Sequence, residues 1–185
     1  MQRPIHSVAR DKLINRNLAI IHFIRFIGLR PKEVSSINIR IVNLVQSTID
    51  FKLNGQQTIY KLSDEHIQHI RDYLKDIDQH KKPRWRSHDP LFMSFNNRSN
   101  EYQYDYVSEQ PKRLSVRGIQ EMIKDEVQLA GLRKLSAKHL RNSCIMGHIL
   151  NGQHDKEIQN YFHLTHPFSL HRYKQYKEST RSPSS

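Results

Sequence analysis

The sequence predicts a mainly helical α+β domain with a small antiparallel sheet. Two observations lead to this fold class: apolar residues recur at helical spacing in several segments, and the dipeptide Asn54-Gly55 separates two short β-prone runs. The 185 residues, 36% of them hydrophobic, are enough for one domain with a sizeable core. We expect this domain to span residues 1–177 and a polar, Ser-rich tail to occupy residues 178–185.

A helix followed by a tight turn is expected first. Helical spacing is kept by four apolar residues, Ile20, Phe23, Ile24 and Ile27. Gly28 offers a left-handed end to that helix, and Pro31 suits the first position of a second helix with Glu33 in its first turn. Arg30 is therefore predicted at a tight junction between two helices.

A β-hairpin is predicted next, over residues 48–62. Because an Asn-Gly pair between β-prone runs is the strongest short-range hairpin signal, Lys52 should lie near the hairpin tip. Ser63 then marks the start of a helix. Its apolar face is formed by Ile67, Ile70, Leu74 and Ile77.

The second half of the chain contains four expected helices after a segment without clear periodicity. Residues 79–110 are basic, then aromatic and polar, with a short strand expected at 91–95. Ser115 precedes a helix that Gly131 closes, with Ile119, Met122, Ile123, Val127 and Ala130 on one side. Another helix is expected over 136–150, ending at Gly152. Asp155 should cap a shorter helix to about residue 162, and a last short helix should hold Tyr173.

Charge and cysteine content limit the function classes. Thirty Lys and Arg against eighteen Asp and Glu give a formal charge of +12, which favours nucleic acid as partner, although a merely well-solvated basic surface is the simpler alternative. Cys144 is the only cysteine, so no internal disulfide can form; core packing and a reducing compartment are expected. Without a signal peptide or an apolar run of about 18 residues, we expect a soluble cytoplasmic protein with no membrane partner.

Side chains suited to phosphate chemistry gather toward the C-terminus. Lys138 and Arg141 are three positions apart on a predicted helix and share a face, although such a pair is commonly only a solvated stripe. His163, Tyr173 and the more distant Arg30 complete the set. Guanidiniums clamp phosphate oxygens, a lysine can protonate a leaving oxygen, and a tyrosine can become bonded to phosphorus. The set predicts phosphoryl transfer on DNA.

The order of these residues resembles the catalytic domain of the tyrosine recombinases, the phage-integrase-like family. The resemblance covers about residues 18–176. It rests on Gly28-Leu-Arg-Pro-Lys-Glu33, a following hairpin with a lysine, Leu114-Ser-Val-Arg-Gly-Ile-Gln120, Lys138-His-Leu-Arg141 and a terminal Tyr173. Arg30 and Arg141 match the family's two arginines, Lys52 its hairpin lysine and Tyr173 its nucleophile. The chain departs from the family at Lys138, where most members have histidine.

The histidine that precedes the nucleophile has more than one candidate. His163 lies ten residues before Tyr173, whereas the commoner spacing of nine reaches Leu164. We prefer His163 because a donor to phosphate is needed there and leucine cannot supply one. His166 lies ten residues before Tyr176, so His166 with Tyr176 is the alternative pair.

The resemblance implies a mechanism without cofactors. Tyr173 would attack the scissile phosphate, giving a 3′-phosphotyrosyl link and a free 5′-hydroxyl. Non-bridging oxygens would be stabilised by Arg30, Arg141 and His163. Lys52 would protonate the leaving oxygen, with Lys61 or Lys138 as alternatives. No nucleotide is required, because the covalent ester conserves the bond energy.

No metal and no other cofactor is expected in this protein. Zinc is disfavoured because His163, His166 and His171 have no cysteine or carboxylate partner at a recognisable ligand spacing. The chain also lacks a phosphate-binding Gly loop and a metal-carboxylate cluster that can be recognised from sequence.

The expected partners are double-stranded DNA and, on that DNA, other recombinase subunits. Members of the family usually carry a separate N-terminal domain, so we expect a fragment of a longer recombinase or a short member whose partner clamps the DNA. Two alternatives compete with a recombinase. One is a non-cleaving architectural or directionality factor of the same fold, and the other is a basic helical protein that binds nucleic acid by charge alone.

Overall fold

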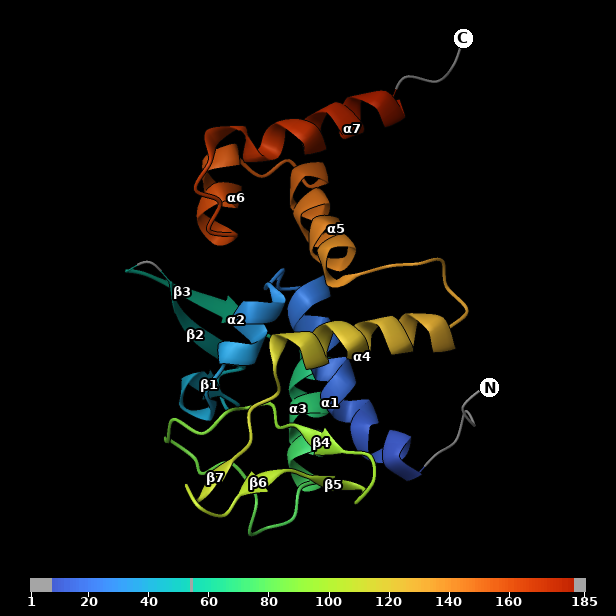
Figure 1. Ribbon diagram of the computed structural model, residues 1–185. Helices are drawn as coiled ribbons and strands as arrows, with labels where there is room; N and C mark the ends of the chain where they lie inside the picture. Colours follow the sequence, from blue (N-terminus) through green and yellow to red (C-terminus); the bar gives the residue numbers. More distant parts are fainter. Residues whose placement is uncertain (1–7, 54, 182–185) are drawn as a thin grey trace.

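The computed structural model describes residues 8–53 and 55–181, which form a mainly helical fold with small antiparallel sheets (Figure 1). This is the fold class that the sequence predicts. The α-helices are α1 (Val8–Arg25), α2 (Pro31–Ser36), α3 (Asp64–Lys75), α4 (Val116–Leu129), α5 (Ala137–Leu150), α6 (Asp155–Tyr161) and α7 (His171–Arg181). Two short 3-10 helices accompany them, η1 (Ile39–Ile41) and η2 (Pro167–Leu170).

The turn between α1 and α2 has the predicted form. α1 ends at Arg25, and Gly28 follows with a left-handed φ of +79°. α2 begins at Pro31, and the Glu33 carboxylate accepts a hydrogen bond of 2.6 Å from the backbone N–H of Arg30. Such a bond satisfies a donor that a helix start leaves without a helical partner.

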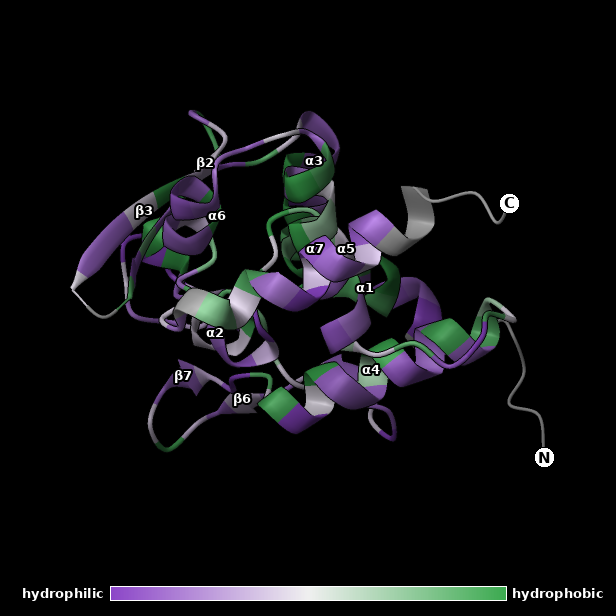
Figure 2. Ribbon diagram, turned by 90° about the horizontal axis from the view of Figure 1, so that it is seen from above, coloured by the Kyte–Doolittle hydropathy of each residue, from purple (hydrophilic) through white to green (hydrophobic). Residues whose placement is uncertain are grey.

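The predicted hairpin is confirmed, although Asn54 itself lies outside the described residues. It belongs to an antiparallel sheet in the order β1 (Val42–Asn43), β2 (Thr48–Leu53), β3 (Gln56–Lys61). Lys52 pairs with Gln57, one step from the last pair of the hairpin, so it lies near the tip. Figure 2 shows that β3 is largely hydrophilic, in agreement with the exposure of most of its residues.

α3 begins as predicted and packs against α1. The Ser63 side chain accepts a hydrogen bond of 3.2 Å from the backbone N–H of His66, which caps the helix. Ile67 and Ile70 are buried in the core, and Ile77, just beyond the helix, is buried as well.

The strand expected at 91–95 does not form as predicted. Leu91, Phe92 and Met93 are buried, but their backbone hydrogen bonds go to two different segments: Leu91 donates to the Ile37 carbonyl, and Leu114 donates to the Phe92 carbonyl. The run is therefore buried but does not form a regular strand. The regular pairs nearby are β4 (Phe95–Asn96) with β5 (Glu101–Tyr102) and β6 (Tyr104–Asp105) with β7 (Gln110–Pro111).

The C-terminal helices are present, with three boundary differences. Ala130 follows the last residue of α4 and is exposed, so it does not belong to the apolar face. His154, not Asp155, is the N-cap of α6; Asp155 lies in the first turn, where a negative charge still favours the helix. α7 continues through residues 178–181 of the expected tail, and residues 182–185 lie outside the described part.

The described hydrophobic residues form two core clusters. The larger joins α1–α4 to the sheets, and the smaller lies within α5–α7, which group at one end of the molecule in Figure 1. Cys144 belongs to the smaller cluster, as expected for a packing residue. Among the described residues, no helix is long and apolar enough to cross a membrane.

Candidate active site

A pocket of about 590 Å³ lies where α2, α4, α5 and α7 approach one another. Of the six predicted site residues, Arg30, Lys138, Arg141 and Tyr173 line it. Six of the described lining residues are Lys or Arg and none is acidic; they are Arg30, Lys124, Lys134, Lys138, Arg141 and Arg172. A hollow with this lining attracts a polyanion, because clustered charge of one sign raises the local concentration of the opposite charge.

Arg30 and Arg141 are linked through one carboxylate. The Arg30 guanidinium donates to Glu33 at 2.7 Å, and Arg141 Nη1 lies 3.8 Å from the other oxygen of Glu33. The Glu33 side chain is buried, while that of Arg30 is nearly half exposed. A buried carboxylate is tolerated when it is paired and hydrogen-bonded, so Glu33 holds the two arginines near each other.

Arg141 is fixed from several sides. It is 8% exposed, and its guanidinium donates to the carbonyl oxygens of Gly28 and, at 2.8 Å, of Phe162. Burial lowers the pKa of Arg141, and the nearby charge of Arg30 lowers it further while Glu33 opposes the change. Because a guanidinium has five N–H donors, these two backbone contacts leave donors for a ligand in the pocket.

The Tyr173 hydroxyl is held by two neighbours at the edge of the pocket. It donates to Asn142 Oδ1 at 2.7 Å and accepts from Arg172 Nη2 at 2.8 Å. The Arg172 guanidinium also lies 4.7 Å from the centroid of the tyrosine ring, within cation–π range. The side chain is otherwise buried in the smaller cluster, so its hydroxyl has a defined position.

The structure places His163 and Lys52 outside the lining of this pocket. His163 Nε2 lies 3.2 Å from the Tyr60 hydroxyl and 3.4 Å from Thr58 Oγ1, both on β3. Burial lowers the pKa of His163; Glu33 raises it, and the neighbouring arginines lower it. Lys52 is exposed near the hairpin tip and makes no hydrogen bond or ion pair with any described residue.

Neither residue of the alternative pair, His166 and Tyr176, lines the pocket. Tyr176 is 62% exposed and is not among the described residues that line the pocket, and His166 is exposed with its ring against Phe168. His139, one position from Lys138, accepts from the backbone N–H of Ser136 at 3.2 Å and so caps α5.

Sequence reasoning missed several residues of the site. Glu33 was quoted in the Gly28–Glu33 motif and assigned to a helix start, but it was given no role in the site. The lining residues Lys124, Lys134, Asn142 and Arg172 were not selected. The one available signal for Asn142 and Arg172 was their direct adjacency to Arg141 and Tyr173.

The chain belongs to the phage integrase family, whose model matches residues 2–179. Among solved structures it is similar to the XerA recombinase, with 20% identity, a TM-score of 0.65, and coverage of 97% of this chain and 65% of that chain. It is also similar to the XerH site-specific recombinase bound to its palindromic difH substrate (21% identity, TM-score 0.61, coverage 95% and 46%).

A third similar structure is the Tn1549 transposon integrase in complex with circular intermediate DNA (13% identity, TM-score 0.60, coverage 95% and 59%). The chain thus spans less than two thirds of the length of each of these proteins. No curated protein matches its sequence.

Proposed function

We propose that this chain is the catalytic domain of a site-specific DNA recombinase that breaks and rejoins DNA through a 3′-phosphotyrosyl intermediate. The observation that supports this most directly is the pocket that combines Tyr173 with six basic side chains. Membership of the phage integrase family supports the same reaction class. Double-stranded DNA is the proposed substrate, and further subunits bound to that DNA are the proposed partners.

Binding of one phosphate in the pocket would use Arg30 and Arg141 as a pair. Their guanidiniums suit the non-bridging oxygens, because planar forks of N–H donors match phosphate geometry better than a point charge does. Glu33 pairs with both arginines and is itself outside the pocket lining, so it does not occupy the space proposed for the phosphate. Lys138 adds a further positive charge from the same face of α5 as Arg141.

Attack by Tyr173 requires its hydroxyl proton to pass to an acceptor, and solvent water is the proposed one, because the Asn142 amide oxygen that receives the hydrogen bond is not a base. A free tyrosine has a pKa of about 10, so the developing phenolate needs a positive environment near neutral pH. Arg172, which already donates to the hydroxyl oxygen, can stabilise that charge, and the other cations of the pocket act in the same direction. The new bond joins the tyrosine oxygen to phosphorus while the bond from phosphorus to the 5′-oxygen breaks.

The leaving 5′-oxygen must receive a proton, and Lys52 is the proposed donor. Lys52 is exposed one pair from the end of the hairpin, and we propose that it contacts a duplex that lies over the pocket. His163, in contact with β3 through Tyr60 and Thr58, is proposed to complete the phosphate contacts. Lys138, which lines the pocket, is the competing donor.

The reaction is tested with a nicked suicide substrate, whose cleavage traps the covalent intermediate. The parental chain should give a protein–DNA adduct that survives denaturation. The adduct should vanish in Tyr173→Phe, which removes one oxygen and little packing, and persist in Tyr176→Phe. The reverse pattern would transfer the nucleophile to Tyr176.

A non-cleaving DNA-binding factor of the same fold is the second candidate. The observation in its favour is Lys138, which stands where most members of the family have histidine. If this alternative is right, the parental chain, with all of its tyrosines present, would bind the suicide substrate tightly but form no covalent adduct. That outcome would rule out the recombinase proposal.

A further inference from the structure

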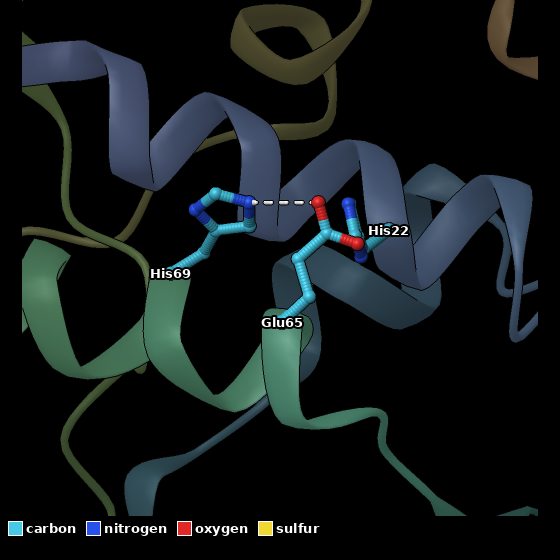
Figure 3. Close-up of side chains that lie close together, drawn as sticks. All are labelled: His22, Glu65 and His69. Atoms are coloured by element: carbon cyan, nitrogen blue, oxygen red, sulfur yellow. Dashed lines mark ion pairs between the residues drawn. The ribbon is translucent and has the colours of Figure 1, made fainter.

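Two histidines and a glutamate lie close together on α1 and α3 (Figure 3). His22 comes from α1, and Glu65 and His69 are four positions apart on α3, so that both face the same neighbouring helix. Their ligand atoms all lie within 4.8 Å of one another. None of the three lines the pocket that contains Tyr173.

The residue types suit a transition metal. Two imidazoles and one carboxylate form a common set of three protein ligands for Zn²⁺, whereas Mg²⁺ and Ca²⁺ prefer oxygen ligands. Ligands bound to one tetrahedral ion at about 2.0–2.1 Å are about 3.3 Å apart. The Nε2 atom of His69 and Oε1 of Glu65 are already 3.9 Å apart, and the Glu65 side chain is 73% exposed, so it can close the remaining distance.

His69 is oriented for such a role by a neighbour. Its Nδ1 lies 3.4 Å from Asn15 Oδ1, and the Asn15 side chain also forms a hydrogen bond with the Asp76 carboxylate. The carboxylate needs the amide N–H₂ of Asn15, so the amide oxygen faces His69 and the Nδ1 of His69 carries the proton. The lone pair of Nε2 then points to the side of Glu65, as in metal sites where a second oxygen fixes the imidazole.

His22 faces the same cluster from α1. It is 8% exposed, and its ring centroid lies 5.2 Å from that of His69. The adjacent His66 packs against Phe23 and bonds to the Ala19 backbone, and its buried Nε2 has no hydrogen-bond partner among the described residues. Glu65 and His69 alone would form an ordinary i,i+4 pair on a helix surface, and the feature that distinguishes the cluster is the approach of the buried His22 from α1 to both of them.

We propose that His22, Glu65 and His69 bind one Zn²⁺ ion that cross-links α1 to α3, with water as the fourth ligand. The ion would act as a structural clamp. It would fix the C-terminal half of α1, the helix that leads to Gly28 and Arg30. This inference does not depend on the proposed recombinase activity.

Bound metal is first removed from the full chain with a chelator. The metal-free chain is then titrated with Zn²⁺, with calorimetry to follow binding and thermal unfolding to follow stability. We expect one equivalent to bind and the unfolding temperature to rise by about 5–10 °C at a hundred-fold excess over Kd. Mg²⁺ should produce no shift. Co²⁺ should give the absorption spectrum of a four-coordinate site.

Glu65→Gln and His69→Ala are the test variants. The Glu65 side chain is 73% exposed, so Glu65→Gln should keep the metal-free unfolding temperature and lose the Zn²⁺-dependent rise. The His69 side chain is only 18% exposed, so His69→Ala is compared with its own metal-free protein and should also lose the rise. His80→Ala, an exposed histidine outside the cluster, is the matched control and should keep it. A rise that is equal in all three variants would assign the binding to other surface histidines, and no rise in the parental chain would equally overturn the proposal.

Discussion

Glu33 is the residue on which the arrangement of the two arginines depends. It accepts from both the backbone and the guanidinium of Arg30, and it lies within ion-pair distance of Arg141. Arg141 is buried, so its charge has lost water and needs compensation. Only a carboxylate supplies both the two acceptor oxygens and the negative charge that this position uses.

We therefore predict that Glu33→Gln lowers the free energy of unfolding by about 1–3 kcal/mol, because it leaves the buried Arg141 with weaker compensation. DNA cleavage should fall with it as the arginine pair loosens. Urea denaturation measures the first effect. The matched control is Glu121→Gln, which breaks the exposed ion pair with Arg117 and should change the free energy of unfolding little. Equal effects of the two substitutions would contradict the role given to Glu33.

At the scale of elements, most of the fold was predictable because its signals are local. Gly28, Pro31 and Ser63 each determine an element boundary through their own backbone or a bond to a residue a few positions away. The run around Phe92 was mispredicted because its backbone bonds connect it to Ile37 and Leu114, which no local pattern indicates.

The candidate site was likewise predictable only in part. The order of residues along the chain selected four of the lining residues, Arg30, Lys138, Arg141 and Tyr173, but not the basic lining residues Lys124, Lys134 and Arg172. It could not identify the contacts of Arg141 with the Gly28 and Phe162 carbonyls, or of Asn142 with Tyr173, because these form only when α5 meets distant segments.

The turn between α1 and α2 should be sensitive to any added side chain. A Cβ on Gly28 would lie against the Phe162 ring and 3.3 Å from Cys144 Sγ, and the residue has φ of +79°. Gly28→Ala should cost about 1–2 kcal/mol for the left-handed backbone and about 1–3 kcal/mol for overpacking. Gly152→Ala is the control: its φ is +77° but nothing lies within 4 Å of the added atom. If both variants unfold at the same urea concentration, this would contradict the close packing of Gly28 against Phe162.

The hairpin has a chemical test of its own. Lys52→Ala should strongly depress cleavage of a normal phosphodiester, because the 5′-oxygen would leave without a proton. A substrate with sulfur at the 5′-bridging position leaves readily without protonation, so it should restore cleavage by this variant. Lys61→Ala, at the far end of β3, should behave like the parental chain. Absence of rescue in a folded Lys52→Ala protein would point to Lys61 or Lys138 as the acid.

At the scale of the whole molecule, the pocket lies at the junction between the two core clusters. Arg30 precedes α2 in the larger part, whereas Arg141 and Tyr173 belong to the α5–α7 part. The parts are joined by the bonds from Arg141 to the Gly28 carbonyl and from the Tyr60 hydroxyl to the Tyr161 carbonyl, the latter 2.9 Å long. The site is complete only while these contacts hold, so changes that loosen the junction should reduce cleavage even where no catalytic group is lost.

The net charge of +12 leads to a prediction for DNA binding by the intact chain. Each phosphate that the protein neutralises releases counterions, so the logarithm of affinity should fall linearly with the logarithm of salt concentration. If the six basic residues of the pocket each neutralise one phosphate, affinity should drop by about a thousand-fold between about 50 and 200 mM salt. Fluorescence anisotropy with a labelled duplex measures the slope. Tyr173→Phe should leave the slope unchanged, because it removes no cation. Lys134→Ala should reduce the magnitude of the slope by about one. An affinity that does not change with salt would mean that phosphate contacts do not dominate binding.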